Sequence, residues 1–217
     1  MNKIKVFGHK NPDLDSVASA FAASYMLNTR DEIIYEPCLL GQINKEAKYV
    51  VDTYGINLNM EIIKKVENDE AVVLVDHNEF TQSVDNIENA DIKIVIDHHK
   101  IDNFRTKNPV EFTARTVGCT CTIIYGMLKE MNKLDNRDVN ILMLAAILSD
   151  TLILKSPTTT KTDIKVVKEL STLLNINYEE LGFNLLKAGA DLSDLTKEQL
   201  IKVDSKIFET NRIENRN

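Results

Sequence analysis

The stretch that decides the fold covers residues 94–99 and has the sequence Ile-Val-Ile-Asp-His-His. Its apolar half is long enough for a buried strand of a parallel sheet, and it stops at an acid followed by two histidines. In open parallel sheets, ligands usually bind in the crevice outside the carboxyl ends of the strands. We therefore predict that Asp97, His98 and His99 belong to a functional loop and not to a simple connection.

A second stretch of the same kind precedes it. Residues 71–75 form an uninterrupted apolar run that ends at Asp76 and His77. The likeness is too short for an internal repeat, so we predict two neighbouring parallel strands that deliver side chains to the same edge of a sheet. Each of the four histidines follows such an apolar run directly or lies one residue beyond it: His9, His77, His98 and His99.

The remaining apolar pattern alternates between strand and helix before residue 118 and is helical after it. Short apolar runs predict strands at residues 3–7 and 33–37 and an edge strand at residues 110–114. Helical spacing predicts helices at residues 16–27, 44–54, 120–131, 136–148, 160–175 and 178–187. We predict a doubly wound α/β fold whose mainly parallel sheet is flanked by helices and followed by a helical segment.

Composition narrows the class of protein. The 217 residues are 43% hydrophobic and 27% charged, as is usual for a globular protein. A net charge of −7 argues against broad binding to nucleic acid or anionic lipid and favours the attraction of cations. No apolar run is long enough for a signal-peptide core or a membrane span, so we expect a cytoplasmic protein.

The three cysteines lack the spacing of a zinc finger and are odd in number. They indicate reduced, buried small residues in a cytosolic protein. A metal-binding Cys-x-Cys pair at Cys119 and Cys121 is the alternative, although these residues lie at a predicted helix start.

The loop after the first predicted strand has the sequence Gly-His-Lys-Asn-Pro-Asp-Leu-Asp-Ser at residues 8–16. His9, Asp13 and Asp15 in such a loop can converge on one or two cations. The alternative is that one aspartate caps the following helix. One aspartate suffices for a cap, and a second acid two residues away adds repulsion unless a cation lies between the two. On these residues alone both interpretations stay open.

Asp150 follows the apolar run of a predicted helix. The negative end of the helix dipole disfavours a carboxylate there, and a bound metal ion would compensate for it. Capping of Thr151 or a surface position is the alternative interpretation. The candidate metal ligands are His9, Asp13, Asp15, Asp76, His98 and Asp150.

Two imidazoles and four carboxylates suit Mn²⁺, Co²⁺ or Mg²⁺ better than ions that prefer thiolates. The set is too large for one ion. Two ions about 3.5–4 Å apart, bridged by a carboxylate and a hydroxide, would create a nucleophile for attack on phosphorus. The reaction class that follows is phosphoryl hydrolysis.

Four strings resemble the signatures of the DHH phosphoesterase superfamily. They are Gly-His-Lys-Asn-Pro-Asp-Leu-Asp-Ser from residue 8, Val-Asp-His-Asn-Glu from residue 75, Ile-Asp-His-His from residue 96 and Leu-Ser-Asp-Thr from residue 148. The residues of these strings also resemble those of the manganese-dependent, or family II, inorganic pyrophosphatases. The resemblance extends through Leu-Leu-Gly-Gln from residue 39, Val-Gly-Cys-Thr from residue 117, Lys-Ser-Pro-Thr from residue 155 and Leu-Lys-Ala-Gly-Ala-Asp from residue 186. It covers nearly the whole chain.

The resemblance implies two manganese positions in each chain. His9 and Asp13 would hold one ion. Asp15, His98 and Asp150 would hold the other.

It also implies roles for the residues between and around the ions. Asp76 would bridge the two ions, and His99 would contact the phosphate or the leaving oxygen as a hydrogen-bond donor or acid. Asp97, Asn78 and Glu79 would orient imidazoles and waters.

The sequence departs from the family pattern toward its C-terminus. Family members continue into a second domain whose Ser-Arg-Lys-Lys-type motif closes over the substrate. Lys206 matches the substrate-binding lysine of the family, and no such motif follows it in this sequence. We expect a metal-binding catalytic domain at residues 1–190 and a linker to an absent second domain at residues 191–217. Hydrolysis should then be slow, since phosphoryl transfer depends on charge stabilisation and positioning.

The resemblance makes hydrolysis of inorganic pyrophosphate the first expectation, with Mn²⁺ as cofactor and a homodimer as the assembly. Two alternatives stay open. One is a DHH-type phosphodiesterase that acts on short oligonucleotides or cyclic dinucleotides. The other is a regulatory lobe that binds metal and phosphate without turnover.

Overall fold

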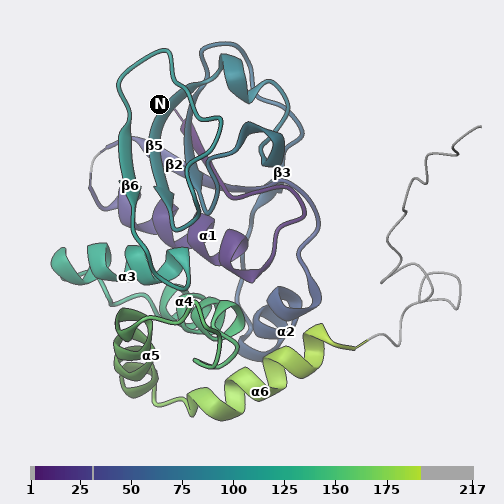
Figure 1. The fold of residues 1–217 in the computed structure, drawn as a ribbon, viewed down its shortest axis with the longest axis vertical. Helices are drawn as coiled ribbons and strands as arrows, with labels where there is room; N and C mark the ends of the chain where they lie inside the picture. The colour runs from purple at the N-terminus through teal and green to yellow at the C-terminus, as the bar shows by residue number, and fades with distance from the viewer. Residues whose placement is uncertain (1–2, 31, 192–217) are drawn as a thin grey trace, which may run out of the picture.

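Six strands form one parallel sheet in the computed structural model, which describes residues 3–30 and 32–191 (Figure 1). They lie in the order β3-β2-β1-β4-β5-β6, and each neighbouring pair is parallel. Their bounds are β1 Lys3–Phe7, β2 Ile34–Leu39, β3 Glu61–Ile62, β4 Ala71–Val75, β5 Asp91–Asp97 and β6 Glu111–Ala114. This order confirms the predicted doubly wound α/β class. The sequence pattern does not predict β3, because a strand of two exposed residues leaves no apolar run.

The predicted helices are all present in the described part of the chain. Their bounds are α1 Leu14–Asn28, α2 Lys45–Tyr54, α3 Thr120–Glu130, α4 Arg137–Asp150, α5 Lys161–Leu174 and α6 Tyr178–Gly189. Local capping explains most starts, since an Asp, Asn or Thr side chain accepts a backbone N–H in the first turn of every helix except α3. The start of α3 has no such side-chain cap.

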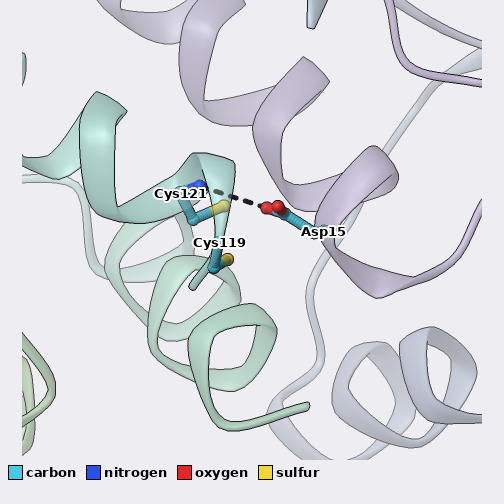
Figure 2. Close-up of side chains that lie close together, drawn as sticks. All are labelled: Asp15, Cys119 and Cys121. Carbon is cyan, nitrogen blue, oxygen red and sulfur yellow. Dashed lines mark hydrogen bonds between the residues drawn. The ribbon is translucent and has the colours of Figure 1, made fainter. Parts of the chain in front are cut away.

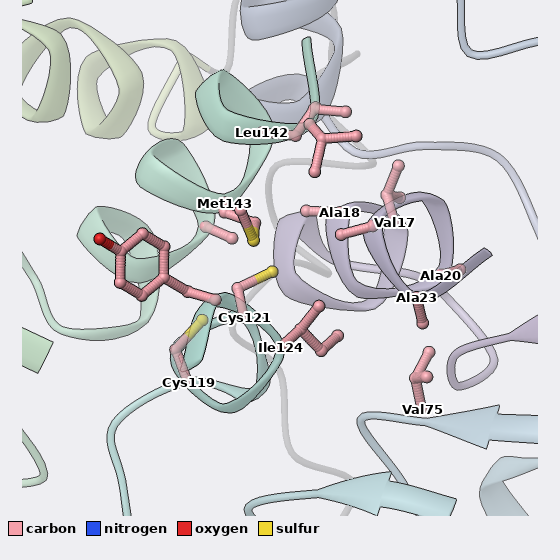
Figure 3. Packing of buried hydrophobic residues seen from close by; sticks show 14 of the residues in the cluster. Val17, Ala18, Ala20, Ala23, Val75, Cys119, Cys121, Ile124, Leu142 and Met143 are labelled. Carbon is pink, nitrogen blue, oxygen red and sulfur yellow. The ribbon is translucent and has the colours of Figure 1, made fainter. Parts of the chain in front are cut away.

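Helix α1 lies between the sheet and helices α3 and α4. Its small side chains are buried on every side of the helix: Ala18, Ala20, Ala22 and Ala23. Small residues let neighbouring elements approach closely, and Figure 3 shows Met143 of α4, Ile124 of α3 and Val75 of β4 around this helix. The close approach brings the start of α1 near the start of α3.

The other face of the sheet differs from the expectation of flanking helices. Its apolar cluster, which includes Phe7, Leu74 and Val95, is covered by irregular segments and by two short 3-10 turns, η1 Phe80–Gln82 and η2 Ile87–Asn89. The described α-helices that contact the strands, α1 and α3, belong to the first face. The segments that cross the second face bury separate apolar side chains such as Ile63. This face is therefore covered without an α-helix, and the sequence of these segments needs no helical periodicity.

The strand order reverses between β1 and β4, which makes this pair the topological switch point of the sheet. The loops that follow the two strands leave the same edge, where ligands of such sheets bind. Lys206 lies outside the described residues. Within the described part of the chain, no helix combines the length and the hydropathy that a membrane span requires.

Candidate metal centre

Two groups of three side chains that consist of the candidate ligands alone lie at this edge, and each is compact enough to hold one metal ion. Within each group one ligand atom per residue lies within 4.8 Å of the others. The first ligand group is His9, Asp13 and Asp76, and the second ligand group is Asp15, His98 and Asp150. The fold thus brings together all six candidate ligands that the sequence pattern indicates.

Asp76 lies between the two ligand groups. It is 1% exposed and follows β4 in a left-handed backbone conformation, with φ of 58°. Its Oδ2 lies 3.5 Å from His9 Nε2, and its Oδ1 lies 3.5 Å from His98 Nε2. Ligand atoms about 2.1 Å from one ion in octahedral geometry stand about 3 Å apart. The two carboxylate oxygens are therefore spaced to face one ion each.

Both histidines are oriented by backbone carbonyl groups. The Nδ1 atom of His9 lies 2.8 Å from the Lys10 oxygen, and that of His98 lies 3.0 Å from the Val117 oxygen. A carbonyl can only accept, so each Nδ1 carries the proton and each Nε2 keeps its lone pair. This is the usual arrangement of a metal-binding imidazole.

Asp13 satisfies both interpretations of the first loop. Its Oδ1 accepts the backbone N–H of Ser16 at 2.9 Å and so caps α1, while its Oδ2 lies 3.4 Å from His9 Nε2. One carboxylate serves the helix and the first ligand group through different oxygens. The start of α1 thereby sets the position of a candidate ligand.

The electrostatics of the two groups fit a cation. Burial, followed by the charges of Asp15 and Asp13, raises the pKa of Asp76 well above its ordinary value. Burial and the charge of Asp15 also raise the pKa of Asp150 well above its ordinary value. Carboxylates that repel one another in a buried place are stabilised by a cation between them. The nitrogen and oxygen donors suit Mn²⁺.

Asp15 is held by the start of α3. Its Oδ2 accepts the backbone N–H of Thr120 at 2.6 Å, and its Oδ1 accepts the N–H of Cys121 at 3.1 Å and the hydroxyl of Ser19 at 2.8 Å. Figure 2 shows Asp15 on α1 pointing at this helix start. The free N–H groups and the positive dipole end of α3 therefore meet a carboxylate that lies about one hundred residues earlier in the chain.

The cysteines beside Asp15 are buried and free, as the sequence pattern indicates. Cys119 is the residue before α3, and Cys121 is in its first turn. Burial raises the pKa of the Cys121 thiol to about 12 and raises that of Cys119 well above its ordinary value. Both remain protonated near neutral pH, whereas a metal ligand is a thiolate. Their sulfur atoms pack beside Asp15, and these three residues also place one potential ligand atom each within 4.8 Å of one another.

His99 points to a different partner from its neighbour His98. Its Nδ1 lies 2.9 Å from Asp97 Oδ1, and the side chain is about half exposed. Asp97 is buried and also accepts the Asn78 amide at 2.6 Å. The hydrogen bond to Asp97 raises the pKa of His99. Glu79 lies farther out, where its carboxylate is 3.4 Å from Lys100 Nζ.

A cleft of about 610 Å³ opens over the two ligand groups. Four of its lining residues are candidate metal ligands: Asp13, Asp76, His98 and Asp150. His99 also lines it, and the rest of the lining, here called the wall of the cleft, consists of residues 116–118 and 157–160. A search of the sequence for metal-ligand residues does not find this wall, because threonine and proline are not typical metal ligands. The strings Val-Gly-Cys-Thr and Lys-Ser-Pro-Thr are the sequence features that coincide with it.

A left-handed turn places the second part of that wall. After α4 the chain passes through three consecutive residues with positive φ: Leu152, Ile153 and Leu154. Such a conformation costs about 1–2 kcal/mol for each residue other than glycine. Ile153 fits against Gly182 of α6, where a Cβ would lie 2.8 Å from its Cγ1. Contact with α6 thus holds the turn that follows Asp150.

His77 lies away from both ligand groups. It is buried, and its ring nitrogens lie 2.9 Å from the Val75 oxygen and 3.0 Å from Ser83 Oγ. Its ring lies near Phe7, which belongs to the second face of the sheet. Burial lowers the pKa of His77 to about 4.

We predict that His77 makes the metal-free protein sensitive to acid. The folded state binds a proton on His77 only near pH 4, whereas the unfolded state binds it near pH 6.5, so stability falls as the pH drops between these values. This difference amounts to about 2 kcal/mol between pH 7 and pH 4.5. When unfolding in urea is measured with a chelator present, the free energy of unfolding should fall between pH 7 and pH 4.5 by about 2 kcal/mol less in His77→Gln than in the wild type. An equal pH dependence of both proteins would contradict the prediction.

The family model described as DHH family, N-terminal domain, matches residues 3–149. The manganese-dependent inorganic pyrophosphatase of Bacillus subtilis is 44% identical over 209 residues, which are 96% of this chain and 67% of that protein. An Oceanobacillus iheyensis protein named "Probable manganese-dependent inorganic pyrophosphatase" is 47% identical, with the same coverage. The chain belongs to the DHH family, in the branch of the manganese-dependent inorganic pyrophosphatases.

Solved structures agree with this membership. A Methanococcus jannaschii protein described as a "putative family II inorganic pyrophosphatase" superposes with a TM-score of 0.76 at 37% identity, over 86% of this chain and 61% of that one. An exopolyphosphatase-related protein from Bacteroides fragilis has a TM-score of 0.65 at 14% identity, which shows a shared fold alone. The chain spans about two thirds of the length of the curated relatives and less of these structures.

Proposed function

We propose that this protein hydrolyses inorganic pyrophosphate to two phosphates with two Mn²⁺ ions bound by the two ligand groups. The observation that carries the proposal is the position of Asp76, which directs one carboxylate oxygen toward the histidine of each group. Two divalent cations, when bound, supply positive charge for the phosphoryl oxygens and lower the pKa of a water molecule. Membership of the manganese-dependent branch supports the choice of metal and substrate.

In this proposal His9 and Asp13 bind the first ion, and Asp15, His98 and Asp150 bind the second. Two of these ligands are held in place by the fold itself, since the α1 cap holds Asp13 and the start of α3 holds Asp15. Such rigid placement reduces the reorganisation that binding requires.

His99 acts on the substrate and not on an ion. Its Nδ1 is occupied by Asp97, so its Nε2 can carry a proton into the cleft. Because Asp97 raises the pKa of His99, a larger fraction of this imidazole is protonated near neutral pH. It donates to a phosphate oxygen and transfers the proton to the leaving phosphate. Asn78 and Asp97 keep the ring in place through a buried hydrogen bond.

The wall of the cleft contributes neutral donors. The Thr160 hydroxyl is already donated to Asp163 Oδ2 at 2.7 Å, so the donors in this part of the lining are the hydroxyl groups of Thr158 and Thr159. We propose that they orient the phosphate that His99 does not contact. Lys206, outside the described residues, is proposed as a further cationic contact at the boundary between residues 1–190 and the segment that follows.

We propose a homodimer through the free edge of β6, the last strand of the described sheet. The three free, buried cysteines favour a reducing compartment such as the cytoplasm.

The function is tested by phosphate release from pyrophosphate and from a cyclic dinucleotide, each in the presence of Mn²⁺. We expect release from pyrophosphate and none from the dinucleotide. Cleavage of the dinucleotide would favour the phosphodiesterase alternative. Manganese uptake without any phosphate release would instead support a binding lobe. A reaction mixture with a chelator in place of Mn²⁺ is the control, and it should show no release.

A further inference from the structure

Thr120 contacts both ligand groups at once. It is the first residue of α3 and is fully buried. Its backbone N–H donates to Asp15 Oδ2 at 2.6 Å, and its hydroxyl donates to Asp76 Oδ1 at 3.0 Å. Asp15 belongs to the second ligand group, and Asp76 completes the first. One residue therefore connects a carboxylate of the second ligand group with the carboxylate that lies between the two groups.

We propose that Thr120 is a positioning residue that sets the spacing between the two metal positions, an inference that rests on the proposed function. Carboxylates rotate about their side-chain bonds unless hydrogen bonds hold them. Asp15 is held by Ser19 and by two N–H groups, so its orientation does not depend on Thr120 alone. Asp76 has a single neutral donor among the described side chains, the hydroxyl of Thr120.

The chemistry of the donor matters here. A lysine or arginine beside Asp76 would neutralise its charge and compete with a cation for it. A hydroxyl fixes the direction of the carboxylate and leaves its charge for the ions. The β-branched side chain of threonine also restricts the rotation of the hydroxyl. The hydrogen bond reaches Oδ1, the oxygen that faces His98, so it acts on the side of Asp76 that completes the second ion's surroundings.

The matched pair of threonines on α3 allows a sharp test. Thr120→Val keeps the shape and the backbone N–H but removes the hydroxyl. Thr122, two residues along, is 3% exposed and donates its hydroxyl at 2.6 Å to Asp163, which belongs to neither ligand group. Thr122→Val therefore makes the same chemical change at a comparable depth without touching a candidate ligand.

The experiment measures Mn²⁺ binding to the metal-free 217-residue chain by calorimetry and by electron paramagnetic resonance. Loss of a partner that orients a ligand typically weakens metal binding by about 10–100-fold. In Thr120→Val we expect the affinity for the ion that binds second to fall by this factor. We also expect the spin-coupled signal of an ion pair to disappear. Thr120→Ser should restore binding to within about threefold of the wild type, and Thr122→Val should stay within about twofold.

Wild-type affinity and a coupled signal in Thr120→Val would overturn the inference. Equal weakening by Thr120→Val and Thr122→Val would also overturn it, because it would show a general effect of packing. If Thr120→Val does not fold, Thr120→Ala and Thr122→Ala replace the pair. Phosphate release is measured separately on the wild type: a chain that binds two ions but releases no phosphate refutes the proposed function, while the metal titrations still decide the role of Thr120. Failure of the wild type to bind two ions refutes both.

Discussion

Asp76→Asn is expected to reduce manganese uptake from about two ions per chain to less than one. Asparagine keeps the size of the side chain, tolerates the left-handed backbone at this position and can still accept the Thr120 hydroxyl. It removes the charge that faces both histidines. Since the loss of an outer partner alone costs about 10–100-fold in affinity, the loss of a shared ligand should cost more than about 100-fold.

A second effect separates ligand loss from misfolding. In the metal-free protein the buried Asp76 is repelled by the charges of Asp15 and Asp13, which raise its pKa. Removing its charge relieves that repulsion. Asp76→Asn should therefore unfold at a higher temperature than the wild type when a chelator is present, and at a lower one when Mn²⁺ is present.

Elemental analysis after gel filtration measures the uptake. Asp69→Asn is the matched control: Asp69 also has a left-handed backbone, with φ of 58°, but its side chain is exposed and pairs with Lys107. The control should retain both ions. A variant Asp76→Asn that also retained both would mean that Asp76 is only an acid at the end of a strand.

Substitutions of the two adjacent histidines, His98 and His99, are expected to have different effects on metal binding. His98→Gln should lose the ion of the second ligand group, because only its Nε2 faces Asp76 while its Nδ1 is committed to the Val117 carbonyl. His99→Gln should retain both ions. Its Nδ1 lies 3.7 Å from Asp76, close enough to suggest a third ligand group, but that atom already makes a hydrogen bond with Asp97.

Turnover and metal content together decide this division. A positioned acid contributes about 10²–10⁴-fold to a rate, so His99→Gln should lower kcat by that factor at full metal content. His98→Gln should lower phosphate release in proportion to its missing ion and recover part of it at high Mn²⁺. Equal metal loss in the two variants would contradict the assignment, and recovery of His99→Gln at high Mn²⁺ would assign its imidazole to an ion.

Much of the site can be predicted from short stretches of sequence. The apolar runs before Asp76 and His98 indicate parallel strands that end at one edge of the sheet, and the loop containing His9 and Asp13 follows a third such strand. These signals are local, because a strand, the acid at its end and the helix after it lie within a few residues of one another. That is why every described strand except β3, the described helices and the six candidate ligands could be predicted without knowledge of contacts between distant residues.

Other features depended on contacts between distant segments. Every helix begins with free N–H groups, and nothing in the sequence around Thr120 indicates that those of α3 meet Asp15. The covering of the second sheet face by irregular segments also leaves no periodic pattern. The left-handed turn at Ile153 is stabilised by Gly182, which lies in a different helix.

The sequence by itself indicated which side chains are candidate ligands and at which edge of the sheet they lie. The tertiary structure alone decided how each carboxylate is turned, because that depends on donors such as Thr120 and Ser16 and on the close approach of α1, α3 and α4. It also decided that His98 faces Asp76 while His99 contacts Asp97, since adjacent residues have the same local signal and only the groups around them distinguish the two rings.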